Sequence, residues 1–388
     1  MKYLKRYNEM SKKRVFFIDN LRTSLIILVI LFNLALIYGS PLSNRPYHEG
    51  QPPGIIQSIL ESIFYLSFLA VTESFFMGFF FMISGYFTPD SYDRKGAWPF
   101  FKDRLLRLGT PLLFYIIFIH PLMAYAIAVS TKEFVGSFFD FLGLYMGNYE
   151  ILGSGPLWFL EVLLIFNGAY VLWRRLVKST NTEIKIPGNK TIAIFALILG
   201  IVTFIVRIWL PSNWNFKLLN LQIAFFPQYI AMFIVGLIAY RGNWFLRISR
   251  ETGRLWLQIS VVLIILFPFL LGLYINTGDL TRRYGGFYWQ AFTFALWEQF
   301  IGIAIIMALL VLFREKYDYQ GRLTEAMSAS AYTVYIFHLP IIVFLALRLQ
   351  GIALNPLLKF VLVAPLAVAI CFLISNYIRK LPLARRIL

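Results

Sequence analysis

The sequence predicts an all-α, polytopic integral membrane protein with about ten transmembrane helices and both termini in the cytoplasm. Two features of the composition support this: 59% of the 388 residues are hydrophobic and only 14% are charged. A soluble domain has about 25% charged residues, so the composition excludes a soluble globular enzyme, a disordered chain and a coiled coil. The third feature is the way positive charge is distributed along the chain. We expect one membrane domain over 1–388, with basic cytoplasmic tails at 1–17 and 379–388.

Ten stretches are long and apolar enough to cross a bilayer, which takes about 20 mostly apolar residues. We expect helices at about 18–39, 63–87, 108–130, 155–175, 191–210, 221–240, 255–275, 287–313, 331–349 and 357–378. Loops rich in Gly, Pro and Asn separate most of them. The first stretch lacks a small-residue cleavage site, so we expect an uncleaved helix rather than a signal peptide. No internal repeat is visible in the sequence, and an inverted-repeat transporter therefore gains no support.

The net charge of +17 predicts how the chain is oriented in the membrane once the Lys and Arg residues are assigned to the two sides of these spans. Of the 36 Lys and Arg residues, 27 fall on the side that holds both tails, eight fall on the other side, and Arg22 lies in the first span. The positive-inside rule then puts both termini in the cytoplasm, so we expect the lipid bilayer as a partner and no nucleic acid. A glycan at the Asn189 sequon would contradict this orientation, because Asn189 falls on the cytoplasmic side.

Charged and polar residues inside spans are costly and tend to mark function. Arg22 and Asn33 lie eleven residues apart in the first span, nearly three helical turns, so they share a face at about 16 Å. Asp19 is three residues before Arg22 and can pair with it. The alternative interpretation is an ion pair at the membrane interface and an Asn that packs between helices.

The second and third spans carry further candidates. Glu73 and Ser84 are also eleven residues apart and are expected on one face, although Ser84 with Gly85 would equally suit small-residue helix packing. Arg104 and Arg107 lie at the inner mouth of the third span. Arginine binds phosphate bidentately, whereas the alternative is a cytoplasmic topology anchor.

Two later segments complete the set. Glu161 lies one turn deeper in the fourth span than Trp158 and needs a partner. Tyr335 and His338 are helical neighbours, and Pro340 follows them and frees a backbone carbonyl. A single His inside a span can also be a purely structural group.

Absent motifs narrow the chemistry. Cys371 is the only cysteine and there are three histidines, so we expect no disulfide and no metal site. The sequence contains no Walker loop, HExxH or GxSxG. Any chemistry must therefore use Arg, Glu, Ser, Tyr, Asn and His.

Taken together, these segments resemble the membrane acyltransferase 3 family, and within it the glucan succinyltransferase-like proteins. The matching pieces are IDNLRTSLIILVILF, FFFMISGYF, RLLRLGTPLLFY, GPLWFLEVLLIF, FPQYIAMFIVGLIAYRGNW and SAYTVYIFHLP. Their order and spacing on ten spans are specific as a set. The resemblance implies an O-acyltransferase that moves an acetyl or succinyl group from cytoplasmic acyl-CoA to a hydroxyl of an extracytoplasmic glycan or similar acceptor in the cell membrane.

The resemblance also assigns roles to residues. The family motif in the first span is an Arg, ten residues, then a His; Arg22 matches, but Asn33 stands at the His position. The family's late Tyr-x-x-His falls on Tyr335 and His338. An amide cannot accept a proton as an imidazole does. We therefore expect little or no transfer by this chain, unless His338 provides the base that position 33 lacks.

The family's inner Arg-x-x-Arg falls on Arg104 and Arg107. The resemblance implies that these two, helped by Arg22 and with Ser84 beside them, hold the phosphates of CoA. The acceptor hydroxyl is expected to approach from outside, near Trp158, Glu161 and His338.

Two functions of other classes stay open. One is a non-catalytic membrane protein that binds acyl-CoA or a glycan, which the Asn at position 33 favours. The other is a transporter or flippase in which Glu73, Glu161 and Glu298 form a proton relay.

Overall fold

The computed structural model describes residues 15–39, 55–147, 153–177, 184–216, 221–352, 354–382 and 384–386, and no side chains for 55–58. In these ranges the chain forms helices and no β-strand, which confirms the all-α prediction. Ten helical segments of this part are long and apolar enough to cross a membrane. The tail at 1–14 and the loop at 40–54 lie outside the described residues.

Nine of the ten spans contain one or two long helices, and most of their ends lie within a few residues of the predicted ones. They are α2 (Phe16–Tyr38), α3 (Ile55–Glu73) with α4 (Phe76–Lys95), α9 (Trp158–Leu176), α10 (Asn189–Trp209), α11 (Phe226–Gly242), α13 (Arg250–Asn276), α14 (Trp289–Lys316), α15 (Arg322–Arg348) and α16 (Pro356–Ile378). The largest difference among single-helix spans is at α15, which begins at Arg322 rather than near 331. Two short helices were not predicted, α8 (Phe138–Gly147) and α12 (Trp244–Arg247).

The remaining span is a helical run with two π-helical segments. It consists of α5 (Ala97–Arg104), a π-helix at Leu105–Gly109, α6 (Thr110–Phe114), a second π-helix at Tyr115–Ile119 and α7 (His120–Ser130). Pro111 and Pro121 lie just after these π-helices, and each removes a backbone donor from the helical ladder. Because the run starts at Ala97 rather than near 108, Arg104 and Arg107 lie inside a helix and not in a loop at its mouth.

The second predicted span is broken, which corrects one expectation. Helix α3 ends at Glu73 and α4 starts at Phe76, with a turn at Ser74 between them. The carbonyl of Ser74 accepts a hydrogen bond from the Gln228 amide of α11 at 2.7 Å, and the Ser74 hydroxyl donates to the Val71 carbonyl. Glu73 and Ser84 therefore do not share a face of one continuous helix.

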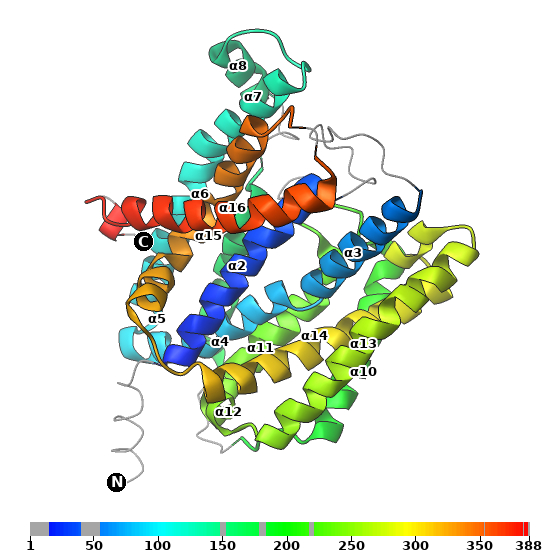
Figure 1. Cartoon of the computed structure of the whole chain (residues 1–388). Coiled ribbons are helices and arrows are strands. Elements are labelled where there is room, and N and C mark those ends of the chain that lie inside the picture. Colours follow the sequence, from blue (N-terminus) through cyan, green and yellow to red (C-terminus); the bar gives the residue numbers. More distant parts are fainter. Residues whose placement is uncertain are drawn as a thin grey trace.

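Helix α2 lies in the middle of the bundle and packs against α15, α16, α14 and α4 (Figure 1). Helix α4 packs along α11, and α14 packs between α10 and α13. Because the number of spans is even, the start of α2 and the end of α16 lie on the same face of the bundle. We name this the N-terminal face. The other face, where α2 ends, is named the opposite face. In Figure 1 these faces lie at lower left and upper right.

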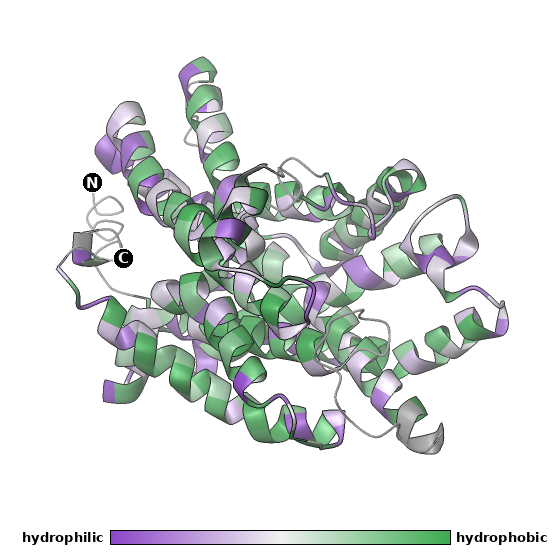
Figure 2. Ribbon diagram, turned by 90° about the horizontal axis from the view of Figure 1, so that it is seen from above, coloured by the Kyte–Doolittle hydropathy of each residue, from purple (hydrophilic) through white to green (hydrophobic). Residues whose placement is uncertain are grey.

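The contact between α4 and α11 depends on two glycines. A Cβ atom on Gly236 would lie 2.1 Å from the carbonyl oxygen of Met82, and one on Gly85 would lie 2.3 Å from that of Phe233. The two backbones thus touch directly, as small residues allow in membrane helices. Figure 2 shows that hydrophobic residues dominate most of these helices, with hydrophilic residues frequent near the helix ends.

Candidate active site

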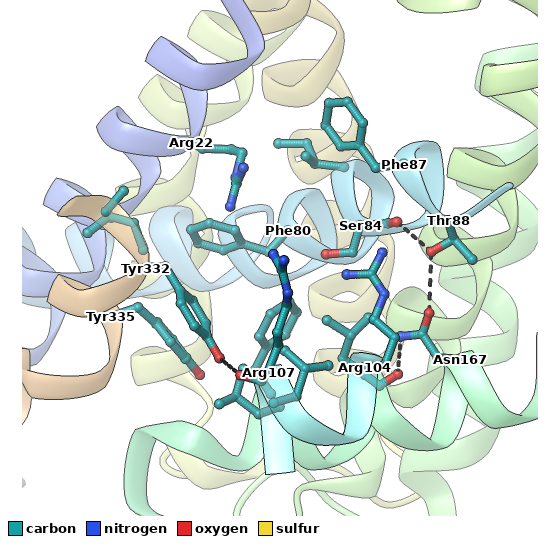
Figure 3. Close-up of a pocket in the computed structure, with 17 residues that line it drawn as sticks. Arg22, Phe80, Ser84, Phe87, Thr88, Arg104, Arg107, Asn167, Tyr332 and Tyr335 are labelled. Atoms are coloured by element: carbon teal, nitrogen blue, oxygen red, sulfur yellow. Dashed lines mark hydrogen bonds between the residues drawn. The ribbon is translucent and has the colours of Figure 1, made fainter. Parts of the chain in front are cut away.

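A cavity of about 330 Å³ lies among α2, α4, the first π-helix, α9 and α15 (Figure 3). Its polar lining consists of Arg22, Ser84, Thr88, Arg104, Arg107, Asn167, Tyr332 and Tyr335. We name it the arginine cavity. Every described residue that lines it is neutral or positively charged. Arg22 lies in the first half of α2, and Arg104 and Arg107 lie near the start of the run that begins at Ala97, so the arginines of the cavity lie toward the N-terminal face.

Three guanidinium groups from two separate elements point into the arginine cavity. Arg22 comes from α2, while Arg104 and Arg107 come from the π-helical run, and Figure 3 shows them turned toward one another. The Arg104 guanidinium stacks over the Phe100 ring at 5.2 Å, and its buried Nε has no hydrogen-bond partner in the described part of the chain. Arg107 pairs with Asp103 outside the cavity at 3.2 Å. The arrangement has spare capacity to bind an anion.

The first π-helix is fixed to α15 through a backbone carbonyl. The hydroxyl of Tyr332 donates to the carbonyl of Arg107 at 2.5 Å. Pro111 has no N–H to offer that carbonyl, which is four residues earlier, so the usual helical partner is missing. The Tyr332 hydroxyl takes its place and thereby holds the Arg107 backbone at the edge of the cavity.

Asn167 and Thr88 also line the cavity, and the sequence analysis missed both. The Asn167 amide donates to the Leu163 carbonyl at 2.6 Å, and the Thr88 hydroxyl lies 3.5 Å from the Asn167 amide oxygen. A buried Asn in the middle of an apolar span is a polar group in a costly place. That rule would have found Asn167 had it been applied to the fourth span.

Asn33 and His338 lie beside each other, although they are 305 positions apart in the chain. The Asn33 amide nitrogen lies 3.4 Å from His338 Nε2 and donates to the Val29 carbonyl at 2.9 Å. His338 is fully buried, and its Nδ1 lies 2.7 Å from the Tyr335 carbonyl. A carbonyl can only accept, so Nδ1 carries the proton and the lone pair of Nε2 faces Asn33.

Tyr335 connects this pair to the arginine cavity. Its ring lines the cavity, its centroid lies 6.0 Å from that of His338, and its hydroxyl donates to the Pro156 carbonyl. Glu161 of α9 lies close enough to Tyr335 to interact with it electrostatically. Glu161 Oε2 is buried without a hydrogen-bond partner among the described residues. Seven of the eight predicted site residues thus line the cavity or interact with Tyr335, and the eighth, Asn33, contacts His338. The seven are Arg22, Ser84, Arg104, Arg107, Tyr335, His338 and Glu161.

Glu73 and Glu298, which the transporter alternative joined to Glu161 in a proton relay, belong to a separate cluster. Glu298 of α14 forms a two-pronged ion pair with Arg207 of α10, at 2.5 and 3.1 Å, and both side chains are almost fully buried. Glu73 interacts electrostatically with this pair and with Arg283. Glu73 therefore faces the Arg207–Glu298 pair rather than Ser84. In the described part of the chain, no group of three His, Cys, Asp or Glu residues is placed to hold a metal.

Comparison with known proteins decides the family. A family model described as "Acyltransferase domain", that of acyltransferase 3, matches residues 15–376. The chain belongs to the acyltransferase 3 family. Glucans biosynthesis protein C of Escherichia coli O157:H7 and that of strain K12 are each 27% identical to it over 355 residues, which cover 87% of this chain and 84% of theirs. No solved structure matches. The protein is a multi-pass membrane acyltransferase.

Proposed function

We propose that this acyltransferase moves an acetyl or succinyl group from acyl-CoA to a hydroxyl of a glycan on the other side of the membrane. The observation that carries the proposal is the arginine cavity, where Arg22, Arg104 and Arg107 converge and no described acid lines the wall. CoA is a polyanionic donor whose phosphates need such a site. The proposal places the multi-pass chain in the cell membrane, with the N-terminal face toward the cytoplasm, where acyl-CoA is found.

The acceptor is proposed to be a glucan. The relatives are named for glucan biosynthesis, and a glucan offers many hydroxyl groups to an acyl donor. Ester formation breaks the thioester C–S bond, forms a C–O bond to the acceptor and transfers the hydroxyl proton to the CoA sulfur. A base next to the reacting hydroxyl lowers the barrier to this transfer.

His338 is proposed as that base. Its Nε2 is the nitrogen without a proton, and its ring lies beside Tyr335, which lines the arginine cavity. Asn33, at the position of the family His, contacts Nε2 and would orient the acceptor hydroxyl through its amide. His338 would accept the hydroxyl proton and return it to the leaving thiolate.

Donor binding is tested with purified protein in lipid nanodiscs and radiolabelled acetyl-CoA or succinyl-CoA. Arg104→Gln is expected to weaken binding about tenfold or more, since a charge-assisted pair is worth about 1.5–3 kcal/mol. Arg94→Gln is the matched control, because Arg94 is exposed on the same face and pairs with Asp90. Equal affinity of Arg104→Gln and the unchanged chain would contradict the assignment of the cavity.

The base is tested by transfer to a glucan acceptor. His338→Ala is expected to abolish transfer while binding of acyl-CoA remains, and Asn33→Ala to reduce it. If transfer instead appears only in Asn33→His, position 33 is the site of the base. Saturable binding of acyl-CoA without transfer in every variant would favour the non-catalytic binding protein.

A further inference from the structure

A second cavity, of about 190 Å³, is lined by Trp158, Asn215, Gln222 and Tyr229. We name it the aromatic–amide cavity. Trp158 is the first residue of α9, and Tyr229 lies in the first turn of α11. Both helices start at the opposite face, so this cavity lies toward that face, whereas the arginine cavity lies toward the N-terminal face.

Its lining differs in kind from that of the arginine cavity. Every described residue on its wall is uncharged, so the described part of the wall offers no counter-charge to a phosphate or carboxylate. The amides of Asn215 and Gln222 each present two donors and an acceptor, and both side chains belong to exposed residues. Such a set suits a neutral ligand with many hydroxyl groups.

The aromatic part of the wall is rigid. The Trp158 and Tyr229 rings stack at 5.4 Å with an interplanar angle of 29°, and the Phe81 ring lies 5.0 Å from that of Tyr229. Aromatic faces carry negative charge and attract the weakly positive C–H groups that line one face of a sugar ring. Tyr229 is buried among Trp158, Phe81 and Phe225, so Trp158 is the aromatic side chain that can meet a pyranose beside the two amides.

The buried ion pair of Arg207 and Glu298 supports the aromatic wall of this cavity through Phe225. The Arg207 guanidinium, held by Glu298, lies 4.9 Å from the centre of the Phe225 ring. Phe225 in turn stacks on Tyr229, with ring centres 6.2 Å apart and an angle of 16°. The cluster that contains Glu73 and Glu298 thus fixes the orientation of Tyr229, which gives those charges a positioning role.

The two cavities meet across a single turn of α9. Trp158 faces the aromatic–amide cavity, whereas the next two residues, Phe159 and Leu160, line the arginine cavity. One turn deeper than Trp158 is Glu161, whose Oε2 is buried without a described partner and which interacts with Tyr335. A ligand seated on Trp158 would therefore be separated from the donor cavity by one layer of side chains.

We propose that the aromatic–amide cavity binds one sugar ring of the acceptor, with the ring against Trp158, which Tyr229 supports, and its hydroxyls on Asn215 and Gln222. This proposal names the acceptor subsite of the proposed function, and it rests on that function for the identity of the reaction. The binding itself does not depend on acyl-CoA.

The test is direct binding of glucose disaccharides of defined linkage to the full chain in lipid nanodiscs, measured by saturation-transfer-difference NMR without acyl-CoA. Saturable binding is expected, weakened about tenfold by Gln222→Ala, which removes the hydrogen bonds of the Gln222 amide to the sugar. Trp158→Leu is expected to weaken it at least as much, and Trp158→Phe to restore part of the affinity.

Matched controls lie elsewhere on the opposite face. Asn276→Ala and Trp209→Leu change exposed residues at the ends of α13 and α10 and are expected to leave sugar binding unchanged. Every variant is also tested for acyl-CoA binding, which should be the same throughout.

Two outcomes would overturn the proposal: no sugar binding by the unchanged chain, or equal binding by Gln222→Ala, in either case with acyl-CoA binding intact. If acyl-CoA does not bind but sugar binding follows the Gln222 and Trp158 variants, the subsite stands and the acyl-CoA assignment fails. The two proposals are therefore separable.

Discussion

The ion pair between Arg207 and Glu298 shows how strongly the stability of this bundle depends on a single buried residue. Both side chains are almost fully buried, and removing one partner leaves a charge in a medium that solvates it poorly. Removing one partner of such a pair destabilises the fold by far more than the intact pair stabilises it. Exposed pairs behave differently, because water screens both charges.

We predict that Glu298→Gln lowers the stability of the protein by about 3 kcal/mol, because Arg207 keeps its charge and loses its nearest counter-ion. The measurement is the thermal unfolding midpoint in detergent. Arg282→Gln is the control, since its pair with Asp279 is exposed, and it should change stability by less than about 1 kcal/mol. Equal midpoints for Glu298→Gln and the unchanged chain would refute the prediction.

At the residue scale, spacing along the chain predicted which side chains share a helix face but not which helices meet. The eleven-residue spacing of Arg22 and Asn33 predicted a common face, and the arginine pair Arg104 and Arg107 was identified from its motif. The contact of Asn33 with His338 could not be derived, since it joins residues 305 apart. Trp158 was expected near the acceptor, but the amides that share its cavity were missed, because Asn215 and Gln222 belong to no recognisable motif.

At the scale of the helices, the tightest packing constraint is the crossing of α4 and α11. Two backbones that touch leave no room for a methyl group. A Cβ on Gly236 would lie 2.1 Å from the Met82 carbonyl oxygen, so the helices must separate to admit it. That separation would also shift Ser84, which lines the arginine cavity on α4.

We predict that Gly236→Ala destabilises the protein by about 1–3 kcal/mol, as overpacking does, and weakens acyl-CoA binding. Gly272→Ala is the matched control, because a Cβ there would meet no atom within 4 Å and alanine favours the helix. Thermal midpoints and acyl-CoA titrations of the two variants check this. A Gly236→Ala protein as stable as Gly272→Ala would show that the crossing is loose.

The sequence predicted the number of spans and most of their ends because the length of an apolar stretch is a local property of the sequence. It did not predict irregularities inside spans. Hydropathy treats 63–87 as continuous, whereas the Gln228 amide captures the Ser74 carbonyl and the helix breaks there. The π-helix before Pro111 likewise has a partner from another helix, the Tyr332 hydroxyl. Those tertiary contacts, rather than local propensity, shaped the arginine cavity.

At the scale of the whole molecule, the two cavities lie toward opposite faces and meet at the start of α9. A donor held by arginines toward one face and an acceptor held toward the other would not need to cross the bilayer as intact molecules. Only the acyl group would pass the layer formed by Phe159, Leu160 and Tyr335. This division of labour requires the N-terminal face to be the cytoplasmic one, as 27 of the 36 Lys and Arg residues indicate.

The orientation is predicted to appear in cysteine labelling of intact cells. In a Cys371→Ser background, which removes the only native thiol, a membrane-impermeant maleimide should label Asn276→Cys at the end of α13. It should label Glu251→Cys, at the start of the same helix, only after the membrane is permeabilised. Both positions are exposed, so accessibility depends on the side of the membrane alone. The reverse pattern would place the arginine cavity toward the outside, away from acyl-CoA, and would contradict both the orientation and the proposed donor.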